Sequence, residues 1–317
     1  MVWRTSWSTR WEGGTVAEPG AVPHETPRAV LHETPRAVLH DIRYSRYQGA
    51  LRPRRSAVAS FVASGVRRPL GLRRSASAKI WPFLLLAVAY LPALAVVAVP
   101  LLVPAVDVQP TDLIDYPQLL TTNSVVLLAF VATSIPSMLT RDRRDRVLSL
   151  YFATALSWFE YVLGVFLAAL ALLALIVLGP MLVLFVGSIA TADAPGAWFA
   201  DHVGDLPRIV GAAALVVLFH TSLGLAIGSL TSRRVFAVGG YLAVVLVGPA
   251  LTGAVAAVTG EEWPFSLDPS SGPIRLATTF IGGGLGDPGA LAWFVWGVVV
   301  VGGLSVLAGR YARGSDA

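Results

Sequence analysis

YVLGVFLAALALLALIVLGPMLVLFVGSIA, residues 161–190, contains no charged side chain. An α-helix rises 1.5 Å per residue, so about 20 such residues cross the roughly 30 Å of hydrocarbon in a bilayer. The strands of a membrane β-barrel would alternate between apolar and polar residues instead of staying apolar throughout. The stretch therefore predicts a membrane-spanning helix and indicates that lipid surrounds much of this chain.

Five more uncharged runs of sufficient length occur along the 317 residues, and 55% of all residues are hydrophobic while only 14% are charged. Their polar interruptions are Thr, Ser, Asn or a single His, which a membrane helix can bond to its own backbone or to a neighbour. The sequence predicts an all-α polytopic membrane protein with a six-helix domain over residues 81–310. The six predicted spans are 81–106, 119–140, 161–188, 209–230, 235–258 and 288–309.

The segments between the spans alternate in charge. The basic ones are the flank before the first span, residues 141–146, the Arg233 and Arg234 pair, and the end of the chain with Arg310. The connections after spans one, three and five are acidic. Because Lys and Arg resist translocation across the membrane, we expect the basic segments, both termini and the tail 311–317 to be cytoplasmic. In the last acidic connection, residues 274–285 are apolar but too short to cross, which predicts a re-entrant or interfacial segment.

The first 80 residues differ from the rest. HETPRAVL occurs twice in succession, at residues 24–31 and 32–39, in a stretch rich in Pro and charge. Two copies of eight residues are too few and too short for a solenoid, so we expect residues 1–55 to be a disordered extension or an upstream mis-annotation that ends in a basic flank. Residues 56–80 carry apolar residues near helical spacing between arginines, which predicts an amphipathic helix in the cytoplasmic interface. A basic flank that only sets topology is the alternative.

Catalytic patterns are sparse. The sequence has no cysteine, which excludes thiolate metal sites and cysteine nucleophiles, and no GxxxxGK[ST] loop for ATP. His220 and Ser222 would diverge by about 200 degrees on a helix, so they cannot form a nucleophile and base pair. We predict no enzymatic activity, metal or cofactor in this chain, and no nucleic-acid partner. His220, as a hydrogen-bonded histidine or a gate, and Pro180, as a helix bend, are the candidate pathway residues.

The remaining feature is the charged cluster in LTRDRRDRVLSLYF, residues 139–152. A loop needed only to orient two spans would not require the interleaved Asp142 and Asp145, nor an apolar and aromatic stretch after them. Charge of both signs beside an apolar face suits contact with another protein. We therefore predict a docking surface at Arg141, Asp142, Arg143, Arg144, Asp145, Arg146, Leu148, Leu150, Tyr151 and Phe152.

The stretch RDRRDRVLSLYFATALSWFEYVLGVFLA, residues 141–168, resembles the corresponding loop of ATP-binding-cassette (ABC) type-2 permeases, the membrane subunits of bacterial exporters. Residues 40–55, HDIRYSRYQGALRPRR, resemble the start of one bacterial branch, and the likeness covers roughly residues 40–312. Val165 stands where Lys is common, and Thr154 and Ala155 where Arg and Pro are common. The matching residues are Arg141, Asp142, Arg143, Leu148, Leu150, Tyr151, Tyr161, Val162 and Gly164.

The resemblance implies a multi-pass protein of the bacterial cell membrane that pairs with a second permease copy and with a separate P-loop ATPase. Residues 141–159 would then act as the coupling helix, and ATP would be bound by the partner subunit. A secondary transporter remains open as an alternative, as does a non-transporting subunit of a larger complex. The second permease copy would form either a homodimer or a heterodimer with this chain.

Overall fold

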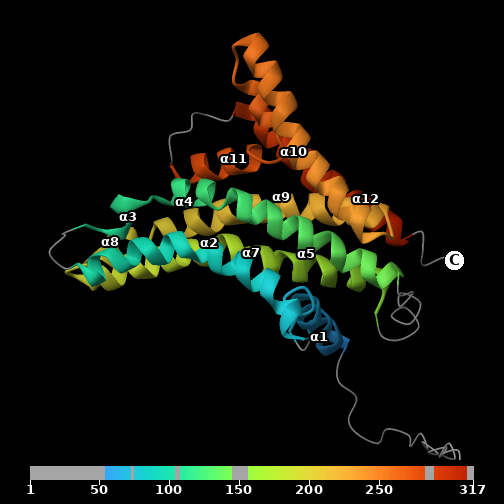
Figure 1. Cartoon of the computed structure of the whole chain (residues 1–317), viewed down its shortest axis with the longest axis horizontal. Coiled ribbons are helices and arrows are strands. Elements are labelled where there is room, and N and C mark those ends of the chain that lie inside the picture. The colour runs from blue at the N-terminus through green and yellow to red at the C-terminus, as the bar shows by residue number, and fades with distance from the viewer. Residues whose placement is uncertain (1–53, 73–74, 104–107, 145–155, 283–288, 313–317) are drawn as a thin grey trace, which may run out of the picture. The chain divides into compact units, whose positions relative to one another are not determined.

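The computed structural model describes residues 54–72, 75–103, 108–144, 156–282 and 289–312. Those residues form helices joined by turns, without a strand among them (Figure 1). Of the predicted extension 1–55, residues 1–53 lie outside the described residues and Arg54 and Arg55 begin helix α1; the end of the tail, 313–317, also lies outside them. The helices are α1 (Arg54–Arg67), α2 (Ala76–Leu102), α3 (Pro110–Leu113), α4 (Tyr116–Thr122), α5 (Ser124–Arg144), α7 (Trp158–Thr191), α8 (Pro195–His202), α9 (Asp205–Leu230), α10 (Arg234–Thr259), the 3₁₀ helix η1 (Trp263–Leu267), α11 (Gly272–Ile281) and α12 (Gly289–Ala312).

Within the described residues, six helices are long and apolar enough to cross a membrane: α2, α5, α7, α9, α10 and α12. This confirms the all-α fold with six spans. The predicted second span, 119–140, is divided, because α4 ends at Thr122 and α5 begins at Ser124. Between them Asn123 is buried, and its amide nitrogen donates to the carbonyl of Ala89 on α2 over 2.9 Å.

The third span begins at Trp158, three residues earlier than predicted. The hydroxyl of Ser157 accepts from the backbone amide of Glu160, and the Glu160 carboxylate accepts from the backbone amide of Ser157. This capping box satisfies two amides that the first turn of a helix would otherwise leave without partners. The helix continues through Pro180 to Thr191.

Helix α9 lies at the centre of the packing. It contacts α5, α7, α11 and α12, and two thirds of its most apolar window is buried. Gly224 and Gly228 lie four residues apart on the side that faces α5, and a Cβ at Gly228 would lie 3.0 Å from the Cα of Pro136. Small residues at this spacing let membrane helices approach closely enough for their backbones to touch.

The connection between α10 and α12 folds back onto the bundle. Helix α11 packs on α9 and α4, and η1 packs on α10. Buried Asp268 precedes α11, and its carboxylate accepts hydrogen bonds from the backbone amides and hydroxyls of Ser270 and Ser271. The predicted apolar segment of this connection is thus a short helix seated against the span helices, too short to cross a bilayer itself.

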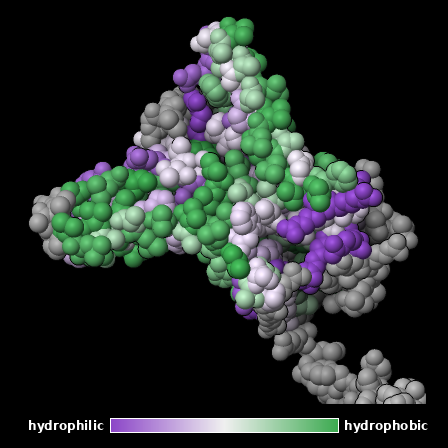
Figure 2. Space-filling view, viewed as in Figure 1, coloured by the Kyte–Doolittle hydropathy of each residue, from purple (hydrophilic) through white to green (hydrophobic). Residues whose placement is uncertain are grey.

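Two of the acidic connections lie near each other. Burial raises the pKa of Tyr116, at the start of α4, well above its usual value, and the nearby charge of Asp205, at the start of α9, raises it further. These two acidic connections therefore share one end. Figure 2 shows a large hydrophilic patch beside the ends of α5 and α10, while apolar surface covers much of the rest of this face.

Candidate functional site

The charged cluster begins inside a helix. Residues 141–144 form the last turn of α5, so the second span continues into the segment that we expected to be a loop. Cations are favourable at this position because the C-terminal end of a helix carries partial negative charge. Six of the predicted docking residues lie outside the described residues: Asp145, Arg146, Leu148, Leu150, Tyr151 and Phe152.

Asp142 is the buried member of this turn, with 5% of its surface exposed. Its Oδ2 accepts a hydrogen bond from the hydroxyl of Tyr161 on α7 over 3.1 Å. Its Oδ1 lies 3.4 Å from the Nη1 of Arg68, which follows α1. A buried carboxylate is costly unless it is hydrogen-bonded and paired, and these contacts satisfy that requirement. Asp142 therefore joins the end of α5 to α1 and α7.

Tyr161 is itself enclosed by aromatic rings. Its ring centroid lies 5.4 Å from that of Phe61 on α1 and 5.3 Å from that of Tyr311 on α12. Both separations fall in the range at which tilted aromatic pairs attract each other beyond the burial of their area. Tyr161 is fully buried, so its hydroxyl is held in position to reach Asp142.

Arg143 turns towards the end of α9. Its Nη1 donates a hydrogen bond to the carbonyl oxygen of Ser229, and its Cζ lies 5.9 Å from the ring centroid of Tyr311. A guanidinium at this distance from an aromatic face is attracted by the ring electrons. Arg143 thus links α5 to α9 and α12, and its side chain is half-buried.

Arg141 and Arg144, in contrast, are exposed. The predicted docking residues that the structure describes therefore divide into two kinds. Asp142 is buried and Arg143 half-buried, whereas Arg141 and Arg144 expose surface to solvent. Sequence spacing did not separate them, because the division depends on which neighbouring helices reach this turn.

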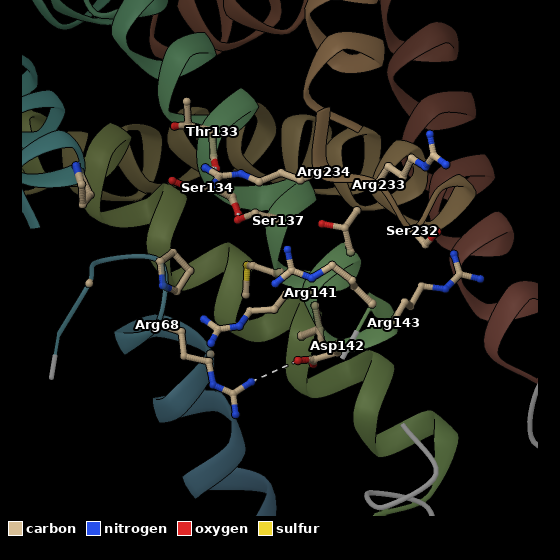
Figure 3. A pocket seen from close by; sticks show the side chains of 18 of the residues that line it. Arg68, Thr133, Ser134, Ser137, Arg141, Asp142, Arg143, Ser232, Arg233 and Arg234 are labelled. Atoms are coloured by element: carbon tan, nitrogen blue, oxygen red, sulfur yellow. Dashed lines mark hydrogen bonds and ion pairs between the residues drawn. The ribbon is translucent and has the colours of Figure 1, made fainter. Parts of the chain in front are cut away.

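A cavity of about 1200 Å³ lies beside this turn, between α1, α2, α5 and the start of α10 (Figure 3). The figure shows arginines from three parts of the chain around it, with Arg68 paired to Asp142. Sequence reasoning used Arg233 and Arg234 only to orient the chain and did not connect them with residues 141–144. Both groups are basic and were predicted to lie on the same side of the membrane, and these two properties could have indicated that they lie close together. The arginines that line the cavity are Arg68, Arg141, Arg143, Arg144, Arg233 and Arg234.

The two candidate pathway residues lie elsewhere. His220 is fully buried on α9, and its Nδ1 shares a hydrogen bond of 2.9 Å with the hydroxyl of Tyr241 on α10. This confirms a histidine bonded to a neighbouring helix, although its Nε2 has no partner among the described residues. Pro180 is buried within α7. Neither residue lines the arginine cavity.

Among the described residues, no group of three or more His, Asp or Glu side chains could hold a metal ion. Comparison with known proteins found no matching family model and no matching curated protein. Three features are available for a functional interpretation: the arginine-rich end of α5, its contacts with four other parts of the chain, and the cavity beside it.

Proposed function

We propose that this chain is the membrane-spanning permease subunit of an ABC exporter in the bacterial cell membrane. A second permease copy would complete the translocation path, and a separate ATPase subunit would drive it through residues 141–159. The observation that carries this proposal is the bonding of Asp142 and Arg143 to other helices. It gives the end of α5 a means of passing motion to the rest of the bundle.

The mechanical argument starts from the position of the turn. A force applied at residues 141–144 acts on a continuous helix, so it moves α5 along its length. Asp142 bonds to Tyr161 on α7 and pairs with Arg68 beside α1, and Arg143 bonds to Ser229 on α9. Packed helices move as rigid elements when such contacts hold their ends together. ATP-driven movement of a partner at this turn would therefore reach α1, α7 and α9 together.

The two kinds of arginine have different roles in this scheme. Exposed Arg141 and Arg144 would attract acidic groups of the ATPase, while Arg143 would carry the movement inward. An ATPase surface that meets these arginines should be acidic, because opposite charges speed association and fix orientation. No residue of this chain needs to be catalytic for this function.

The proposal is tested by expressing the chain together with an ATPase encoded beside its gene. We expect the two to co-purify and to hydrolyse ATP in a vanadate-sensitive reaction. The double variant Arg141→Glu, Arg144→Glu should lose the partner, because reversed charge repels an acidic surface. Arg143→Gln should keep the partner and lose most of the substrate-stimulated hydrolysis.

Arg310→Glu is the matched control, since Arg310 is exposed near the end of α12 and does not line the cavity. It should leave both co-purification and ATP hydrolysis close to the parent values. Unchanged co-purification in the Arg141 and Arg144 double variant would contradict the proposal. So would a chain that purifies alone and moves solute under a proton gradient, which would instead indicate a secondary transporter that uses His220.

A further inference from the structure

The cavity beside the end of α5 has a large excess of positive charge. Six arginines line it, and Asp142 contributes the single carboxylate among its described lining residues. Arg68 pairs with this carboxylate, and arginines from two further parts of the chain line the same volume of about 1200 Å³. Like charges gathered around one cavity repel each other, and an anion between them would lower that repulsion.

The type of cation indicates the type of anion. All six are arginines, whose planar guanidinium donates two parallel hydrogen bonds to the oxygens of a phosphate or carboxylate. The hydroxyl-bearing residues Thr133, Ser134 and Ser137 line the same cavity from α5. A phosphate group accepts several hydrogen bonds at once, so it suits a lining supplied by three separate parts of the chain.

The rim of the cavity is apolar. Trp81 on α2 is 51% exposed, and Val235 and Phe236 at the start of α10 are 80% and 63% exposed. All three line the cavity. The helices that carry them have largely uncovered apolar sides, since only 17% of the most apolar window of α2 and 11% of that of α10 is buried. A ligand in this cavity would meet both cations and apolar side chains.

We infer that this cavity binds the phosphate headgroup of an anionic lipid from the membrane leaflet on the basic side. Basic pockets between membrane helices on the cytoplasmic side are suited to such headgroups. The volume exceeds that needed for a phosphate alone and admits a headgroup with the first part of its acyl chains. The inference rests on the lining residues and does not depend on the proposed transport function.

The test uses the full chain purified in a neutral detergent. Native mass spectrometry would measure binding of dioleoyl phosphatidylglycerol and of dioleoyl phosphatidylcholine, which share acyl chains but differ in net charge. A third titration would add soluble glycerol 3-phosphate as a competitor. We expect phosphatidylglycerol to bind at least tenfold more tightly than phosphatidylcholine, and millimolar glycerol 3-phosphate to leave it bound.

The double variant Arg233→Gln, Arg234→Gln removes two of the cations. An arginine near an anionic lipid contributes about 1 kcal/mol, so the pair should weaken phosphatidylglycerol binding roughly 30-fold. The matched control is Arg67→Gln, Arg310→Gln, which removes the same charge from exposed residues that do not line the cavity. The control should weaken binding less than about threefold, because these two side chains do not line the cavity and solvent ions screen their exposed charges.

Equal binding of the two lipids would overturn the inference, as would an equal loss in the control variant. Complete displacement by glycerol 3-phosphate would overturn the lipid as the source and assign the site to a free phosphate. If the Arg233 and Arg234 double variant does not fold, a photoactivatable phosphatidylglycerol cross-linked to the parent chain decides the question. Cross-links within α1, the last turn of α5 or the start of α10 support the inference, and cross-links confined to other helices contradict it.

Discussion

The hydroxyl of Tyr161 donates a hydrogen bond to the Oδ2 of Asp142 over 3.1 Å, and this bond joins the first turn of α7 to the last turn of α5. The residues are nineteen positions apart, and both are buried. Because a buried carboxylate that loses a donor bears the cost of its lost solvation, this contact contributes more to stability than a surface ion pair of the same chain.

Tyr161→Phe should therefore lower the stability of the chain by about 2 kcal/mol, since hydrogen bonds to charged groups contribute about 1.5 to 3 kcal/mol. Thermal denaturation in detergent, followed by the loss of the monodisperse peak, measures the effect. In an Asp142→Asn background the same substitution should cost less, because the acceptor is no longer charged. Equal melting temperatures for the parent and Tyr161→Phe would show that the bond does not stabilise the fold.

His220 and Tyr241 form a second buried pair, between α9 and α10. Tyr241→Phe removes one partner and leaves the Nδ1 of His220 buried without a bond, so we expect a loss of about 1 to 3 kcal/mol. Adding His220→Leu removes the other polar group and should recover part of that loss. A double variant less stable than either single variant would show instead that His220 has a further role in the packing. Thermal denaturation of all four chains closes this cycle.

Helix α12 offers a matched pair of adjacent glycines. A Cβ at Gly303 would lie 2.9 Å from the carbonyl oxygen of Ser222 on α9, whereas one at Gly302 meets nothing within 4 Å. Gly303→Val must push α12 away from α9, which should cost about 1 to 3 kcal/mol. Gly302→Val should change the melting temperature little. Similar losses in both variants would contradict the close α9 and α12 contact.

The predicted membrane orientation is open to a direct test, because the chain contains no cysteine. Gly196 in α8 and Ser232 before α10 are both exposed and lie in connections of opposite charge character. A membrane-impermeant maleimide should label Gly196→Cys in intact cells and Ser232→Cys only after permeabilisation. The reverse pattern would invert the topology and place the arginine cavity on the outer side.

Much of the fold follows from local properties of the chain. A long run of residues without a charged side chain predicts a membrane span by itself, since neither its length nor its charge depends on contacts with other segments. The boundary between α4 and α5, inside the second predicted span, coincides with a contact between helices. Residues 119–140 read as one run, yet Asn123 bonds to the carbonyl of Ala89 on another helix at the point where α4 ends and α5 begins.

Less of the candidate site than of the fold could be predicted from the sequence. Residues 141–146 were identified as a unit by their charge. Within the described part, 141–144, the sequence did not indicate that Asp142 and Arg143 contact Arg68, Tyr161 and Ser229. These partners are between 19 and 86 positions away along the chain. The spacing of residues within the charged cluster does not indicate which of them contact these distant partners.

The sequence alone therefore predicted the six apolar helices and the charged segments between them, because hydropathy and charge are properties of single residues summed along the chain. Only the tertiary structure decided that one aspartate of the cluster is buried and that one of its arginines reaches the end of α9. It also placed Arg233 and Arg234 around the same cavity as Arg68. Such proximity depends on which helix faces meet, and that is settled by packing between segments far apart in the chain.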